Sequence, residues 1–370
     1  METKLVRIAE ISATTKHPIF TSVYHLINED MLKQCHKELD GSKAVGIDKV
    51  TKDEYGKNLD RNIKDLVQRL KNKSFKPLPS LRVYIPKANG KKRPLGIASY
   101  EDKIVQMAVK KILGAIYEPR FLNCMYGFRP NRGCHEAIKE VYQRISYGKI
   151  SYIVDADIKG FFDHIDHEWM MKFLEWNIQD KNLLWLIRKY LKAGIMEQGK
   201  FEPTEEGSAQ GSVMSPMLAN IYMHHVLTLW FKLVVKKEMQ GECFLVNFAD
   251  DFVAGFQYKS EAERYYKELK ERMEKFEQKV RAYKNWIYDN RNRPMREIIK
   301  ELNVKLIGHY RYYGVTWNFR KITTFLHRVQ QFLFKAMNRR GCRRAYTWNG
   351  FVEMLKYYPL AKPKTYYCLY

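Results

Sequence analysis

Residues 243–256 read Cys-Phe-Leu-Val-Asn-Phe-Ala-Asp-Asp-Phe-Val-Ala-Gly-Phe, two apolar runs on either side of a short acidic stretch. Each run has the length of a buried strand, so the pattern predicts a β-hairpin that carries Asp250 and Asp251 at its tip. Because aspartate also favours ordinary turns, this stretch taken alone fits a solvated loop better. A second acidic strand is needed to separate the two interpretations.

That second strand is expected at residues 151–158, which read Ser-Tyr-Ile-Val-Asp-Ala-Asp-Ile. Side chains alternate along a strand, so Asp155 and Asp157 share one face. Carboxylates gathered between buried strands repel one another and take up protons unless a cation neutralises them. Ligands that are all oxygen, with no Cys or His nearby, favour Mg²⁺, and a pair of ions would suit a phosphoryl centre. The two segments together predict nucleotidyl transfer.

The remaining periodicity predicts an α+β protein. Strands are also indicated at 81–86, and the hairpin extends to about 257. Helical spacing of apolar residues occurs at 52–72, 101–118, 134–147, 166–192 and 260–288. Helices and strands that mix without strict alternation are typical of the α+β class. Only helical patterns follow residue 276, so we expect a separate helical domain over 276–370.

The charge of the chain indicates a polyanionic partner. Lys and Arg number 65 against 41 Asp and Glu, a formal net charge of +24. Nucleic acid is the first candidate and a membrane surface the second. Residues 276–370 alone hold 20 Lys and Arg, 5 Asp and Glu, and 20 of the 51 aromatic residues. Arginine beside aromatic rings suits phosphate contact and base stacking, although a helical bundle with a solvated basic face is the alternative. The arginines predicted to bind RNA are Arg311, Arg339, Arg340, Arg343 and Arg344.

The sequence also bears on the location of the protein. Charged residues interrupt every hydrophobic run, and residues 1–5 lack an apolar signal core. We therefore expect a bacterial cytoplasmic protein that does not enter a membrane. The six cysteines include no C-x-x-C pair, so a zinc site or a disulfide framework is not indicated.

Blocks of sequence along nearly the whole chain match one family in content and in order. They are Ala44-Val45-Gly46-Ile47-Asp48, Val83-Tyr84-Ile85-Pro86-Lys87, Tyr126-Gly127-Phe128-Arg129-Pro130, Asp157-Ile158-Lys159-Gly160-Phe161-Phe162-Asp163, Gly207-Ser208-Ala209-Gln210-Gly211, Phe248-Ala249-Asp250-Asp251, and the helical tail with Gly308-His309-Tyr310-Arg311-Tyr312-Tyr313. The chain resembles the reverse transcriptase/maturase proteins encoded by group II introns. The resemblance implies a right-hand polymerase fold with an N-terminal extension and fingers over 1–150, a palm with an antiparallel sheet over 151–275, and a basic helical thumb or maturase domain over 276–370.

The resemblance also implies roles for the acidic residues. Asp157 and Asp250 would be catalytic and hold two Mg²⁺ ions, with Asp251 beside them and the Ile158 carbonyl completing the ligand set. Asp155 is the least necessary acid, because palm motif A of the family requires only the later aspartate.

Five further residues would handle the nucleotide. Lys87 and Arg93 would clamp the incoming triphosphate. Phe162 would be the steric gate against a ribose 2′-hydroxyl, and an ordinary core phenylalanine is the alternative. Gln210 and Gly211 would contact template and nucleotide. The partners implied are group II intron RNA, an RNA template with a DNA primer, and deoxynucleoside triphosphates, with a homodimer also allowed.

One departure from the family divides the functional hypotheses. The segment 273–276 runs directly into thumb-like sequence at 277–280, so motif D and the primer grip are expected to be missing. A loosely aimed primer end would slow synthesis, since a misplacement of about 1 Å can cost roughly 100-fold in rate. The first hypothesis is a reverse transcriptase that assists splicing. The second is an RNA-binding maturase, or a decayed mobile-element copy, without polymerase activity, and a generic basic DNA-binding protein is a third.

Overall fold

The chain folds into two compact units, Met1–Tyr266 and Lys267–Tyr370. The computed structural model describes residues 2–86, 92–158, 160–204, 206–208, 210–313, 319–338 and 346–364. The boundary between the units lies within helix α11 (Lys259–Asp289), as does the boundary that the sequence predicted after residue 275. The further division of the first unit into fingers and palm stays a prediction.

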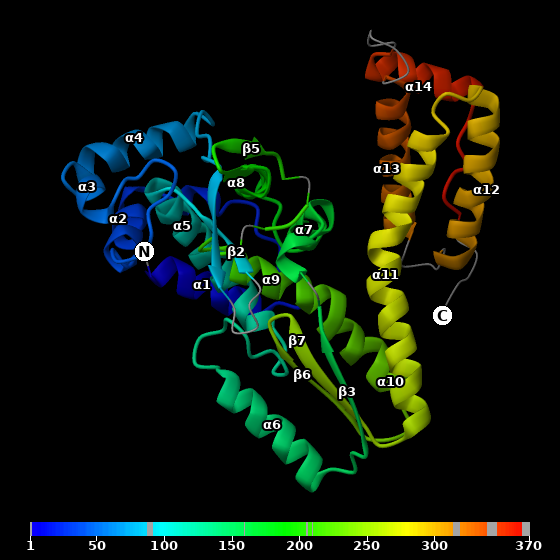
Figure 1. Ribbon diagram of the computed structural model, residues 1–370, viewed down its shortest axis with the longest axis horizontal. Helices are drawn as coiled ribbons and strands as arrows, with labels where there is room; N and C mark the ends of the chain where they lie inside the picture. Colours follow the sequence, from blue (N-terminus) through cyan, green and yellow to red (C-terminus); the bar gives the residue numbers. More distant parts are fainter. Residues whose placement is uncertain are drawn as a thin grey trace. The chain divides into compact units, whose positions relative to one another are not determined.

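A three-stranded antiparallel sheet holds the acidic residues. It consists of β3 (Tyr152–Asp157), β6 (Cys243–Phe248) and β7 (Asp251–Phe256) in the order β3-β7-β6. The strand predicted at 151–158 and the hairpin predicted at 243–257 are confirmed, and with them the α+β class. One face of the sheet is buried, where Phe256 packs against Tyr265 of α11 with ring centroids 5.0 Å apart. Helix α6 (Cys134–Tyr147) packs against β6 and β7 on the opposite face (Figure 1).

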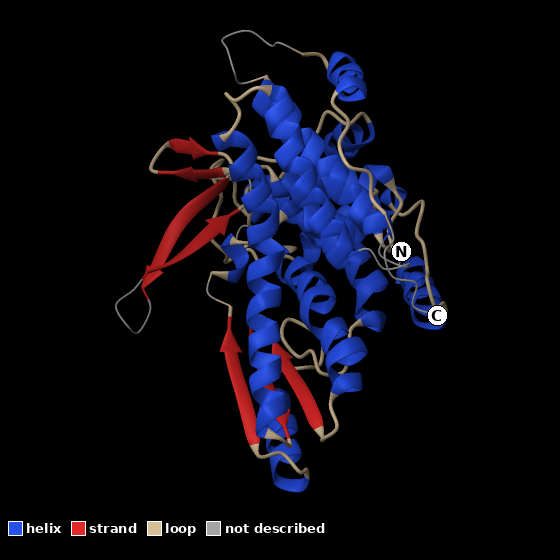
Figure 2. Ribbon diagram, turned by 90° about the vertical axis from the view of Figure 1, so that its right-hand side faces the viewer, coloured by secondary structure: helices blue, strands red, loops and turns tan. Residues whose placement is uncertain are grey.

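A second, four-stranded sheet lies elsewhere in the first unit, as Figure 2 shows. Its order is β2-β1-β4-β5, from β1 (Ser80–Pro86), β2 (Lys92–Ile97), β4 (Ile195–Glu197) and β5 (Lys200–Glu202). The strand predicted at 81–86 is confirmed as β1. The other three strands were not predicted, because they are short or contain Lys, Pro and Gly, which are depleted in strands.

Helices form the rest of the first unit. Their bounds are α1 (Glu2–Thr14), η1 (Tyr24–Leu26), α2 (Glu29–Glu38), α3 (Lys52–Gly56), α4 (Leu59–Lys71), α5 (Tyr100–Tyr117), η2 (Glu118–Arg120), α6, η3 (Phe161–Asp163), α7 (His167–Glu175) and α8 (Lys181–Leu191). The helices predicted at 101–118, 134–147 and 260–288 are confirmed as α5, α6 and α11. The single helices predicted at 52–72 and 166–192 are each two helices.

The break at 166–192 has a clear physical cause in Asp180. One carboxylate oxygen accepts hydrogen bonds from the backbone N–H groups of Asn182 and Leu183 at 3.0 and 3.2 Å, which starts α8. The other oxygen accepts from the N–H groups of Val23 and Tyr24, both at 2.7 Å. Asp180 is buried, so these four bonds satisfy its charge and tie the N-terminal segment to this point.

An apolar helix, Ser215–Glu238, runs through the first unit. It comprises α9 (Ser215–Met223), the π-helical stretches η4 (His224–Thr228) and η5 (Phe231–Val235), and α10 (Lys236–Glu238). By length and composition it is the one described helix that could cross a membrane, yet 67% of its most apolar window is buried inside the protein. Burial in the core explains its apolar sequence, and a span is only weakly indicated.

In its described residues the second unit contains helices and no strand, and it has its own core. After α11 it contains α12 (Met295–Tyr313), α13 (Phe319–Met337) and α14 (Trp348–Tyr357). Its buried side chains include Ile287, Ile298, Leu302, Leu306, Val329, Leu333 and Phe351. The Asn303 amide donates to the carbonyl of Pro359 at 3.0 Å and accepts from the N–H of Ala361 at 2.7 Å, which fastens the segment after α14 to α12.

Candidate active site in the first unit

The acids from separate parts of the chain meet at one end of the three-stranded sheet. Asp157, the last residue of β3, lies directly opposite Asp251, the first residue of β7. The backbone N–H of Ile158 donates to the carbonyl of Asp250 at 3.4 Å. Asp155 lies opposite Val253, two residues along the same face. Asp155, Asp157 and Asp251 are exposed there, whereas the sequence analysis placed them between buried strands.

The negative charges at this end of the sheet act on one another. Partial burial, and then the charges of Asp250, Asp157 and Asp155, raise the pKa of Asp251 above its ordinary value. A cation would relieve this repulsion, and the oxygen donors suit a hard divalent ion. In the described part of the chain no three His, Cys, Asp or Glu side chains are grouped so as to enclose a metal. The open arrangement still fits Mg²⁺, which usually takes one or two carboxylates and completes its shell with water and substrate phosphate.

The turn that carries Asp250 is held from within its hairpin by Asn247. Ala249 has a φ of 59°, in the left-handed region that few non-glycine residues adopt. The buried Asn247 amide donates to the carbonyls of Ala249 and Asp251 at 2.8 and 3.2 Å, on both sides of Asp250. These two bonds fix the tight turn in spite of its strain.

The same turn is also held from outside the hairpin. The backbone of Asn247 donates to the carbonyl of Cys124 at 2.7 Å and accepts from the N–H of Tyr126 at 2.8 Å. Gly127 lies so close to the turn that an added Cβ would be 2.4 Å from the nitrogen of Ala249. The Asn220 amide of α9 donates to the Gly127 carbonyl at 2.8 Å. Segments far apart in the sequence therefore fix the position of the acids.

The supporting roles of Asn247, Gly127 and Asn220 were not predicted from the sequence. A polar Asn in an otherwise apolar strand was one available signal, because buried polar groups are normally hydrogen-bonded. Gly127 appears in one of the family blocks, but no local pattern shows what Gly127 or Asn220 contacts.

Gln210 and Gly211 are brought against Arg93 of β2. The N–H of Gly96 donates to the backbone carbonyl of Gln210 at 2.6 Å. With the Gln210 amide oriented by its neighbours, its oxygen accepts from Nε and Nη2 of Arg93 at 3.0 and 2.5 Å, and its nitrogen donates to the Pro94 carbonyl at 3.0 Å. Gly211 has a φ of 108°, and an added Cβ would be 3.0 Å from the Gly96 carbonyl. The exposed Arg93 guanidinium is thus oriented by a neighbouring loop.

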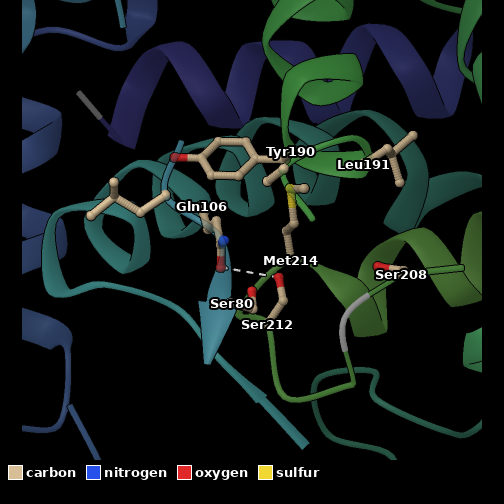
Figure 3. A pocket seen from close by; sticks show the side chains of 9 residues that line it. Ser80, Gln106, Tyr190, Leu191, Ser208, Ser212 and Met214 are labelled. Atoms are coloured by element: carbon tan, nitrogen blue, oxygen red, sulfur yellow. Dashed lines mark hydrogen bonds between the residues drawn. The ribbon is translucent and has the colours of Figure 1, made fainter. Parts of the chain in front are cut away.

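Hydrogen bonds to α5 hold the loop that contains Gln210 (Figure 3). The Gln106 amide oxygen accepts from the Ser212 hydroxyl and from the N–H of Val213, both at 3.0 Å. The hydroxyls of Ser208 and Ser215 lie 2.6 Å apart. A cavity of about 20 Å³ beside these groups has room for roughly one water molecule. This size makes it a packing feature of the loop rather than a substrate pocket.

Phe162 is a buried residue of η3. Its ring packs edge-on against Phe161 and Phe128, with centroids 5.5 and 6.5 Å apart. Its carbonyl accepts from the N–H of Ser208 at 2.7 Å, which joins η3 to the loop of Gln210. These contacts suit a core residue, and they also give a rigid wall, so the predicted steric gate stays a prediction.

Several predicted site residues cannot be placed. Lys87, Arg339, Arg340, Arg343 and Arg344 lie outside the described residues, and Arg311 belongs to α12 but its side chain lies outside them too. Their predicted roles in binding triphosphate and RNA stay predictions.

Comparison with known proteins agrees with the geometry of the first unit. The group II intron-encoded protein LtrA of Lactococcus lactis subsp. cremoris is 36% identical over 239 residues, which are 64% of this chain and 40% of LtrA. An uncharacterized 91 kDa protein in the cob intron of Schizosaccharomyces pombe is 37% identical over 54% of this chain and 25% of its own length. Protein YkfC of Escherichia coli is 37% identical over 50% of this chain and 49% of its own length. The chain spans less than half the length of each of these relatives.

A comparison with protein families matches a range that contains β3 and the acidic hairpin β6–β7. Residues 85–310, more than half of the chain, match the description "Reverse transcriptase (RNA-dependent DNA polymerase)". The protein belongs to this family, and its relatives include group II intron-encoded proteins.

Proposed function

We propose that the protein is a group II intron reverse transcriptase, which extends a DNA primer on an RNA template from deoxynucleoside triphosphates. One observation carries the proposal: Asp157 of β3 lies opposite Asp251 of β7, and Ile158 is hydrogen-bonded to the backbone of Asp250. Acids about 90 residues apart in the sequence thereby form one cluster on an exposed face, where a nucleotide can reach them.

The roles follow from the chemistry of the residues. Asp157, Asp250 and the Ile158 carbonyl would hold magnesium, with Asp251 beside them. Two bound ions would activate the primer hydroxyl and neutralise the charge of the triphosphate. Arg93, oriented by Gln210, would bind the triphosphate through its planar guanidinium.

The remaining nucleotide residues would define the space for the sugar and the template. Gly211 would allow close approach of the backbone, as it already does to Gly96. The ring of Phe162 would exclude a ribose 2′-hydroxyl. Lys87 would join Arg93 on the triphosphate.

The proposed partners are nucleic acids, in keeping with the net charge of +24. They are an RNA template with its primer and a group II intron RNA, whose splicing the chain would assist. A homodimer and a bacterial cytoplasmic location complete the proposal.

Primer extension on an RNA template with Mg²⁺ tests the enzyme hypothesis. We expect wild-type synthesis to be abolished by Asp157→Asn and by Asp250→Asn, and Asp155→Asn to retain more activity than either. Undiminished synthesis by Asp250→Asn would contradict the assignment of the cluster as the catalytic centre. Each variant keeps the shape of the carboxylate, so its melting temperature serves as the control for folding.

A second candidate function is RNA binding without polymerase turnover. It is favoured by the arrangement downstream of β7, where the described residues contain helices and no strand. This arrangement agrees with the expectation that motif D and the primer grip are missing from the sequence after β7. Wild type that binds RNA with a steep salt dependence but makes no DNA would support this candidate.

A further inference from the structure

A second cavity in the first unit, of about 330 Å³, involves none of the proposed catalytic residues. It lies between the end of α1, the turn η2, the end of α7 and the helix η4–η5. Its volume is at the lower end of the range for small-molecule sites, which suits one nucleotide better than a duplex.

The cavity is lined by cationic side chains. Lys16, Arg120 and Lys232 contribute to its wall, and no Asp or Glu does. In the described part of the chain no ion pair is found for Lys16 or Lys232, so both ammonium groups are available to an anion. Arg120 is held in place, because it donates to the carbonyls of Ser12, Thr15 and Lys16 at the end of α1 at 3.2 to 3.5 Å.

The positive charges also affect His224, a buried histidine that lines the same cavity. Burial, and after it the charges of His225, Arg120, Arg129 and Lys232, lower the pKa of His224 to about 3. His224 is therefore neutral near pH 7, and its Nδ1 lies 3.2 Å from the hydroxyl of Thr228. The lining of the cavity thus contains a neutral imidazole together with the cations Lys16, Arg120 and Lys232.

An indole ring completes the cavity. Trp176 is the C-cap residue of α7, and it is 60% exposed although it lines this cavity. Proteins that bind single-stranded nucleic acids combine an exposed aromatic ring with cations: bases stack on the ring, and phosphates contact the charged groups. A small anion would use the lysines only, and an acidic peptide would gain little from the ring.

We propose that this cavity binds one nucleotide of a single-stranded nucleic acid, with its base on Trp176 and its phosphate on Lys16 and Lys232. The inference deepens the nucleic-acid binding of the proposed function and rests on it, but it does not require polymerase activity. The same chemistry could come from RNA or from single-stranded DNA, so the experiment has an arm for each.

The test uses the full chain and fluorescence anisotropy with 15-nucleotide oligouridylate or oligothymidylate, over a range of KCl concentrations. Trp176→Ala should weaken binding about 10-fold, the loss of one stacked base, whereas Trp176→Phe should retain most of the affinity. Lys232→Gln should make the slope of log affinity against log salt shallower by about 0.7, the release of one counterion. Lys237→Gln, an exposed lysine of the same helix outside the cavity, is the matched control.

Wild-type affinity in Trp176→Ala, or the same slope change in Lys232→Gln and Lys237→Gln, would overturn the proposal. Polyglutamate that competes as well as an unlabelled oligonucleotide would also overturn the proposal, because binding would then depend only on negative charge. The two oligonucleotides tell which nucleic acid the cavity prefers. Because these measurements read binding and not synthesis, a wild-type protein that makes no DNA but shows these affinity changes would contradict the polymerase proposal and support this one.

Discussion

Replacement of Gly127 by alanine should displace the turn that carries Asp250. The new Cβ would be 2.4 Å from the nitrogen of Ala249 and 3.0 Å from the carbonyl carbon of Phe248, both backbone atoms that cannot rotate away. Ordinary contacts begin at about 3.4 Å, so the turn or the segment of Gly127 has to move by about 1 Å. A misplacement of that size at a reacting centre costs roughly 100-fold in rate.

The assay is primer extension under single-turnover conditions with Mg²⁺, together with thermal unfolding. We expect Gly127→Ala to be about 100-fold slower than wild type and less stable by about 1 to 3 kcal/mol, the usual cost of overpacking. Gly114→Ala is the matched control, because its new Cβ would meet only the terminal carbon of Met217, at an ordinary 3.6 Å. That control lies inside α5, where Ala is favoured over Gly by about 1 kcal/mol, so it should be at least as stable as wild type.

Two results would refute this reasoning. One is a Gly127→Ala variant with the rate and melting temperature of wild type. The other is equal loss of activity in Gly114→Ala, which would show that any added methyl group is harmful. If wild type makes no DNA, the difference in melting temperature between the two variants still tests the packing.

Three other perturbations have expected outcomes. Burial raises the pKa of Asp102 to about 6, so between about pH 4 and 6 the folded chain holds a proton that the unfolded chain releases. Stability should therefore fall by about 3 kcal/mol as the pH rises from 4 to 7, and unfolding curves of Asp102→Asn should lack most of that fall; parallel curves for both proteins would contradict the shift. Asn247→Ala leaves two carbonyls beside Asp250 without their donor, and should lower stability by about 1 to 3 kcal/mol in urea unfolding and slow primer extension. Asn303→Ala removes both bonds that hold the segment after α14, and hydrogen exchange should become faster at Ala361 while the amides of β7 stay protected; unchanged exchange at Ala361 would show that the clamp is unimportant.

Local sequence pattern was sufficient to predict the strands that carry the acids. It was not sufficient to predict the contacts that hold the acidic turn in place. Alternation placed Asp155 and Asp157 on one face, and the apolar runs around Asp250 predicted the hairpin, because both signals lie within a few residues. Exposure of the acids was not predicted, since it depends on which distant elements pack over that face of the sheet.

Contacts between distant residues account for most of what the sequence did not reveal. Asp180 starts a new helix within a helical pattern through one carboxylate oxygen, and its other oxygen accepts from backbone N–H groups 156 and 157 residues away. The Asn220 amide reaches Gly127 across 93 residues. No periodicity records such partners, so they become visible only when the chain is folded.

Among the described residues, the supports found for the acidic turn lie in β3, β6, α9 and the 124–127 segment, all of which precede residue 267. Deletions or exchanges further toward the C-terminus would therefore leave these supports of the acidic turn in place, while they could change how a primer is positioned. If such a chain made no DNA, the cause would be poor positioning of the primer, which a grafted primer-binding segment could restore.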